Sequence, residues 1–184
     1  MPGASPAVKR SNSYEHLVFP SWQIRLLMSS SLSFVCSSAF AAHMHQRNLS
    51  LVLLVAGICS LNYWRAPGAS WRRDADLAAA GVGLGYCLYT GFWLEGACAR
   101  VGWASLVSAL ACFRKSWMLS LGHCERWACW HAIAHALSGV AAAALAVGNV
   151  ASRGEAYTPP RNVIAECSLV AIILTVLMDS CKPS

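Results

Sequence analysis

Long apolar runs separated by short polar segments are the feature that most constrains how this chain folds. The runs lie at residues 24–42, 49–64, 77–94, 101–119, 127–148 and 163–179. A hydrocarbon layer roughly 30 Å thick is crossed by about 20 helical residues, and most of these runs approach that length. Because backbone amides find no water inside a bilayer, they must pair within their own segment, as they do in a helix. The pattern predicts an all-α integral membrane protein, a bundle of about six transmembrane helices.

Charged residues are sparse and lie mainly between the apolar runs. Only 12% of the 184 residues are charged, whereas soluble domains usually have about a quarter. The net charge of +6 comes from scattered basic residues, so nucleic acid is not an expected partner. If the N-terminus is cytosolic, most of the 14 Lys and Arg residues face the cytosol, and only four face the other side: Arg47, Arg100, Arg153 and Arg161. The positive-inside rule therefore predicts a multi-pass protein with a cytosolic N-terminus.

The chain divides into a polar tail and a membrane domain. Residues 1–16 have no periodic apolar pattern and are predicted to be a disordered cytosolic tail, whereas residues 17–181 are predicted to form the transmembrane helical bundle. In the third run, Gly81 and Gly85 repeat the small-xxx-small spacing of membrane helix contacts, which permits close helix approach there. Membrane lipids are the expected partners, and no feature of the sequence fixes an oligomeric state.

Two histidines lie one helical turn apart inside the fifth apolar run. His131 and His135 are separated by Ala-Ile-Ala, and residues four apart share one face of a helix. Ionisable side chains are costly at membrane depth, so such a pair is a candidate functional site. Two imidazoles supply half of a tetrahedral zinc site, and the third protein ligand is expected to be either His123 or Asp76.

Two further polar residues are expected at the same membrane depth. Ser60 lies near the end of the second run, Asp76 lies directly before the third, and His131 follows the start of the fifth. Because successive spans alternate in direction, these positions fall in the same leaflet. Asp76 is a candidate base, or a partner that orients a histidine. Ser60 is a candidate hydrogen-bond partner of water or an oxyanion. We therefore predict Ser60 and Asp76 as catalytic residues.

Together these residues resemble the pattern of the CREST superfamily of membrane hydrolases, which includes alkaline ceramidases and progestin and adipoQ receptors. That pattern has a serine late in one helix, an aspartate early in the next and a later His-xxx-His helix. The segments Ser60-Leu-Asn-Tyr-Trp-Arg and Trp71-Arg-Arg-Asp-Ala-Asp resemble a divergent version of the helix pair. The resemblance implies a helical bundle that holds a buried zinc ion and hydrolyses a lipid amide.

The chain departs from this family in two ways. The family usually has a third zinc-binding histidine four residues after the serine, whereas this chain has Trp64 there. Family members also commonly have seven spans, against the six predicted here. An alternative function is therefore a non-catalytic receptor-like or scaffold protein in which the histidine pair is structural. A second alternative is a transporter or channel lined by the same polar residues, but the far halves of the third and fifth runs are almost entirely apolar.

Overall fold

The computed structural model describes residues 19–68, 70–122 and 124–154. These residues form five helices and no strand: α1 (Ser21–His43), α2 (Arg47–Arg65), α3 (Trp71–Phe92), α4 (Gly96–Leu121) and α5 (Trp127–Ser152). Each of the first five predicted spans coincides with a helix, which confirms the all-α class. The predicted tail at 1–16 and the sixth predicted span at 163–179 lie outside the described residues.

Three of these helices are long and apolar enough to cross a membrane, namely α1, α4 and α5. They fit an integral membrane protein. The other two, α2 and α3, coincide with predicted spans but are less apolar, because polar residues occupy their ends. Arginines begin and end α2, and α3 starts with the segment Trp71-Arg-Arg-Asp-Ala-Asp. Length and composition therefore support three of the five predicted spans that fall in the described part of the chain.

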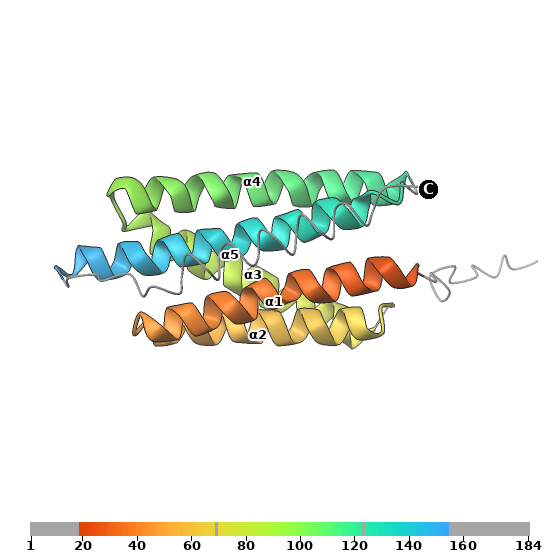
Figure 1. Ribbon diagram of the computed structural model, residues 1–184, viewed down its shortest axis with the longest axis horizontal. Coiled ribbons are helices and arrows are strands. Elements are labelled where there is room, and N and C mark those ends of the chain that lie inside the picture. The colour runs from red at the N-terminus through yellow and green to blue at the C-terminus, as the bar shows by residue number, and fades with distance from the viewer. Residues whose placement is uncertain (1–18, 69, 123, 155–184) are drawn as a thin grey trace, which may run out of the picture.

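The helices lie side by side in an elongated bundle (Figure 1). Helix α5 packs along both α4 and α1, α1 packs on α2, and α2 packs on α3. Helix α3 has only small contacts with α4 and α5. The central position belongs to α5, the helix that carries the histidine pair.

Among the described helices, close approach occurs at glycines other than Gly81 and Gly85. A Cβ atom added to Gly139 of α5 would lie 3.0 Å from Ser37 Oγ of α1, and one added to Gly57 of α2 would lie 3.0 Å from Val35 Cγ2 of α1. By contrast, Gly81 and Gly85 are exposed, and a Cβ on either would meet nothing within 4 Å. None of the other described helices therefore packs against Gly81 and Gly85, and a close helix contact at this pair stays a prediction.

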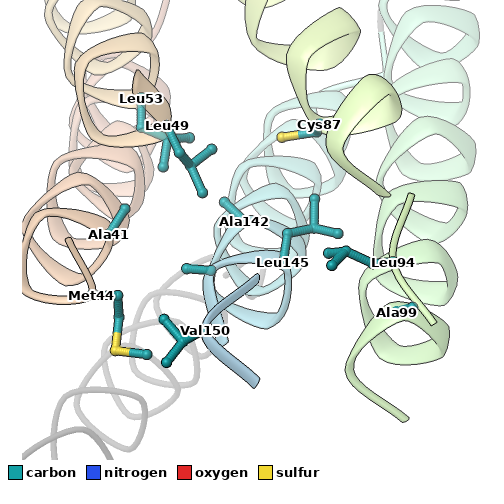
Figure 2. Packing of buried hydrophobic residues seen from close by; sticks show 11 residues of the cluster. Ala41, Met44, Leu49, Leu53, Cys87, Leu94, Ala99, Ala142, Leu145 and Val150 are labelled. Atoms are coloured by element: carbon teal, nitrogen blue, oxygen red, sulfur yellow. The ribbon is translucent and has the colours of Figure 1, made fainter. Parts of the chain in front are cut away.

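Two buried clusters occupy opposite ends of the bundle. The aliphatic end is built mainly from the last turns of α1 and α5 and the first turns of α2 and α4: Ala41, Met44, Leu49, Leu53, Cys87, Leu94, Ala99, Ala142, Leu145, Ala146 and Val150 (Figure 2). The aromatic end joins the start of α1, the end of α2 and the start of α5: Leu26, Leu27, Trp64, Ala128 and Ala132, with Trp22, Tyr63 and Trp127 packed against them. The histidine pair belongs to the aromatic end.

Candidate functional site

The two histidines face each other in the first turns of α5. The ring centroids of His131 and His135 lie 4.8 Å apart, with an interplanar angle of 76°. His135 is buried, with 9% of its surface exposed, and His131 is partly buried. The i and i+4 spacing therefore brings two imidazoles into edge-to-face contact within the bundle.

Three serines of α1 bind the part of α5 that contains His135. Ser30 Oγ lies 3.0 Å from His135 Nδ1. Ser33 Oγ donates a hydrogen bond to the His135 carbonyl oxygen at 3.1 Å, and Ser37 Oγ donates to the Gly139 carbonyl oxygen at 3.2 Å. These bonds fix both the height and the rotation of α5 relative to α1, because they engage its backbone and a side chain at once.

His131 is surrounded by aromatic rings. Its ring centroid lies 5.4 Å from that of Trp64, 5.2 Å from that of Phe113 and 6.1 Å from that of Trp127. Among the described residues, no hydrogen bond engages either nitrogen of the His131 ring. Within the described part of the chain, both nitrogens of His131 thus lack a hydrogen bond, whereas one nitrogen of the His135 ring is bonded to Ser30.

Trp64 occupies the position at which the resemblance implies a third histidine, and it lies directly against His131. The indole is 4% exposed, and its buried Nε1–H has no hydrogen-bond partner among the described residues. An indole N–H can donate a hydrogen bond but has no lone pair for a metal ion. Position 64 is thus close to the histidine pair, but its side chain does not act as a metal ligand.

Ser60 faces α1 rather than the histidines. It is 2% exposed, and its Oγ lies 2.9 Å from Ser31 Oγ. Ser31 Oγ also donates to the Leu27 carbonyl oxygen at 2.7 Å. Since a hydroxyl has one proton, Ser60 can donate at any one time either to Ser31 or to the carboxyl group of Asp76. The Ser60 proton is therefore already engaged in the resting site.

Asp76 lies in the first turns of α3, just before the predicted span at 77–94, and its carboxyl group is hydrogen-bonded to Ser60. Burial raises the pKa of Asp76 from 3.8 to about 6, although the bond from Ser60 acts in the opposite direction. Desolvation is the larger effect, because it penalises only the charged form of the acid. At neutral pH this carboxyl group can therefore both accept and release a proton.

The predicted site residues form two pairs joined through α1, not one cluster. His131 and His135 form the first pair, with Ser30 bonded to His135, and Ser60 and Asp76 form the second, with Ser31 bonded to Ser60. Within residues 19–68, 70–122 and 124–154, no hydrogen bond joins either histidine to Ser60 or Asp76.

The metal ligands are incomplete in the described part of the chain, which contains no group of three or more His, Cys, Asp or Glu side chains that could hold a metal ion. The predicted ligand His123 lies outside the described residues. Asp76, the other predicted ligand, is not grouped with the two histidines. His131 and His135 thus supply two nitrogen donors, and His123 as the third ligand stays a prediction.

The serines of α1 are the part of the site that our sequence reasoning missed. The first apolar run contains Ser29-Ser-Ser-Leu-Ser33, followed by Ser37 and Ser38, and most of these side chains are buried. Serine hydroxyls often bond across the interface between membrane helices. A run of serines within a predicted span was therefore a usable signal for a polar helix contact.

Comparison of this chain with protein-family models, with curated proteins and with solved structures finds no match. The resemblance to the CREST superfamily therefore stays a prediction, which rests on the short motifs around Ser60, Asp76 and the histidine pair.

Proposed function

We propose that this chain is a multi-pass membrane protein of about six spans with a cytosolic N-terminus, and that it hydrolyses a lipid amide with the help of zinc. The observation that carries the proposal is the pair of facing imidazoles inside the bundle, which α1 connects to a buried serine and a partly buried aspartate. Membrane lipids would be its environment and the source of its substrate. The exposed large apolar side chains on α3 and α4 support contact with lipid.

Zinc would be held by His131 and His135, with His123 as the third ligand. The fit is partial, because two imidazoles supply half of the tetrahedral ligand set and catalytic sites usually have three protein ligands. When bound, zinc supplies Lewis acidity, which polarises a carbonyl group and activates water.

The chain's own residues would handle the proton and the substrate oxygen. Asp76 would act as the base, because a carboxyl group whose pKa lies near 6 exchanges protons efficiently at neutral pH. Ser60 would hydrogen-bond the developing oxyanion. For that step the Ser60 hydroxyl must turn away from Ser31 or Asp76, so substrate binding would have to break or replace the bond that Ser60 donates.

A non-catalytic receptor-like or scaffold protein is the second candidate function. Trp64 favours it, because a bulky indole without a lone pair lies beside His131 where the resemblance implies a zinc ligand. In this alternative, the histidine pair holds α5 to α1 through Ser30 and packs against the aromatic rings, and no turnover follows.

One experiment separates the two functions. Zinc content and hydrolysis of long-chain N-acyl amides would be measured on the full-length protein in detergent, for wild type and for His131→Ala/His135→Ala. The matched control is His43→Ala/His45→Asn, which removes two exposed histidines from the other end of the bundle. Asparagine is used at position 45 because His45 has a φ of 56°, a conformation that asparagine tolerates.

The hydrolase proposal expects near-stoichiometric zinc and amide hydrolysis in wild type and in the control, and loss of both in the folded His131→Ala/His135→Ala variant. Folded wild-type protein that neither binds zinc nor cleaves the amides would reject the hydrolase and favour the non-catalytic alternative. Zinc without turnover would retain the metal site but remove the enzymatic role.

A further inference from the structure

We infer that Ser30 of α1 is a positioning residue that fixes the tautomer of His135, with the proton on Nδ1 and a free lone pair on Nε2. This inference concerns a residue outside the predicted site and follows from hydrogen-bond geometry alone. It rests on the proposed function only where it is extended to zinc binding.

The tautomer follows from counting protons around Ser30. The Ser30 hydroxyl donates to the Leu27 carbonyl oxygen at 2.9 Å, and a carbonyl oxygen has no proton to offer in return. The same Ser30 Oγ lies 3.0 Å from His135 Nδ1. We assign the single hydroxyl proton of Ser30 to the bond with Leu27, so that Ser30 accepts from the imidazole, which places a proton on Nδ1. In the neutral ring, Nε2 then has the lone pair.

Burial and neighbouring contacts hold this arrangement in place. Ser30 is 5% exposed and His135 is 9% exposed, so bulk water does not readily replace their bond. The Phe34 ring lies 5.1 Å from the imidazole centroid. Ser33 holds the His135 backbone through the carbonyl oxygen. The ring therefore has little freedom to turn and offer Nδ1 to another partner.

The chemical consequence is that Nε2 is the only nitrogen of His135 able to bind a metal ion or accept a proton. An acceptor that bonds the far N–H of a ligating histidine fixes its tautomer and raises its basicity, and losing such a partner typically lowers metal affinity about 10–100-fold. The geometry thus assigns Ser30 the role that a carbonyl or carboxylate partner has in other histidine–metal sites.

The test is nitrogen NMR of metal-free full-length protein with ¹⁵N-labelled histidine in detergent micelles, at a pH where the imidazole is neutral. The variants are Ser30→Ala, Ser30→Thr and Ser33→Ala, and the His135 signals are identified by their loss in His135→Gln. We expect the Nδ1–H tautomer in wild type and Ser30→Thr, which both have a hydroxyl. We expect it also in Ser33→Ala, whose missing bond engages only the His135 backbone. Ser30→Ala should shift His135 towards the Nε2–H form.

An Nε2–H tautomer in wild type, or no change of tautomer in folded Ser30→Ala, would overturn the inference. If Ser30→Ala does not fold, the tautomer of His135 in the wild-type protein alone decides whether the inference holds. Zinc titration then tests the extension, with a 10–100-fold loss of affinity expected in Ser30→Ala and none in Ser33→Ala. Failure of wild type to bind zinc would reject the proposed function and leave the NMR result on Ser30 unaffected.

Discussion

The two ends of the bundle are held together by different physical means. At the aliphatic end, side chains fit against small residues: Leu145 of α5 lies so close to α3 and α4 that Cβ atoms added to Gly91 and Gly102 would be 3.4 Å and 3.1 Å from it. Figure 2 shows Leu145 and Ala142 lying between leucines of α2 and Leu94. At the aromatic end, rings surround the histidines and serine hydroxyls bond from α1 to its neighbours.

This difference separates stability from chemistry. Inside a membrane, helices associate through close packing and hydrogen bonds, because lipid tails are as apolar as the side chains themselves. The aliphatic end relies mainly on packing, which depends on side-chain volume. The aromatic end relies on directional bonds, whose donors and acceptors can also serve a ligand. Substitutions at the two ends should therefore have separable effects.

The largest expected effect is at the aliphatic end. Leu145→Ala should destabilise the fold by about 2–5 kcal/mol, because it leaves a cavity between α5, α3 and α4 where the leucine is 2% exposed. Thermal unfolding in detergent would measure the loss. Leu110→Ala is the control, since Leu110 is 46% exposed and should change stability little. If the tautomer of His135 also changed in folded Leu145→Ala, substitutions at the two ends would not have separable effects.

The second-largest expected effect is a pH dependence of the fold's stability, which arises from Asp76 at the aromatic end. The folded-state pKa of Asp76, about 6, lies above its ordinary value of 3.8, so the fold favours the protonated carboxyl. Stability should be highest below about pH 4, decrease as the pH rises towards 6, and level off above that. The total loss should be on the order of 2–3 kcal/mol.

Asp76→Asn should abolish this decrease, because the amide is neutral at every pH and can still bond Ser60. The free energy of unfolding, measured between pH 4 and 7.5, would show whether the decrease is lost. Asp74→Asn is the control, since it removes a carboxylate of the same helix that is 71% exposed and pairs with Arg73. An equal pH slope in wild type and Asp76→Asn would contradict the prediction.

A third prediction concerns the indole beside His131. Trp64→His should raise zinc affinity by at least about tenfold, equivalent to about 1.4 kcal/mol, because it supplies a third imidazole next to the pair. Trp64→Phe is the control: it retains an aromatic ring but adds no ligand. Zinc titration in detergent compares the three proteins. Equal affinities in Trp64→His and Trp64→Phe would indicate that position 64 cannot reach the metal.

The smallest effect is expected where α4 meets α5. Lys115 Nζ of α4 lies 4.6 Å from the centroid of the Trp130 ring of α5. Lys115→Met should cost about 0.5–1 kcal/mol of stability through loss of the cation–π contact. Arg114→Met, at the adjacent exposed position, should cost less. Identical unfolding temperatures for these two variants would assign the contact no net stabilisation.

Some features of the site could be predicted from sequence because they depend on one helix only. The spacing of His131 and His135 places them on one face of any helix, and the bundle brings their rings together. Two other expectations depended on neighbouring helices. Ser60 was expected at the depth of the histidines, and it bonds Ser31 of α1. The small-residue spacing of Gly81 permits a close contact, but no other described helix lies against it. Rotation about a helix axis decides both, and residue spacing alone does not determine it.

By itself, the sequence determined that the described chain is helical, where its five helices lie, and that two histidines share a face of the fifth. These properties follow from local hydrophobicity and from the need of each backbone to bond within its own segment in an apolar medium. Only the tertiary structure decided that α1 supplies the serines that bind His135 and Ser60, and that Trp64 lies against His131. Those contacts join residues up to 105 positions apart, and they depend on how whole helix surfaces fit together.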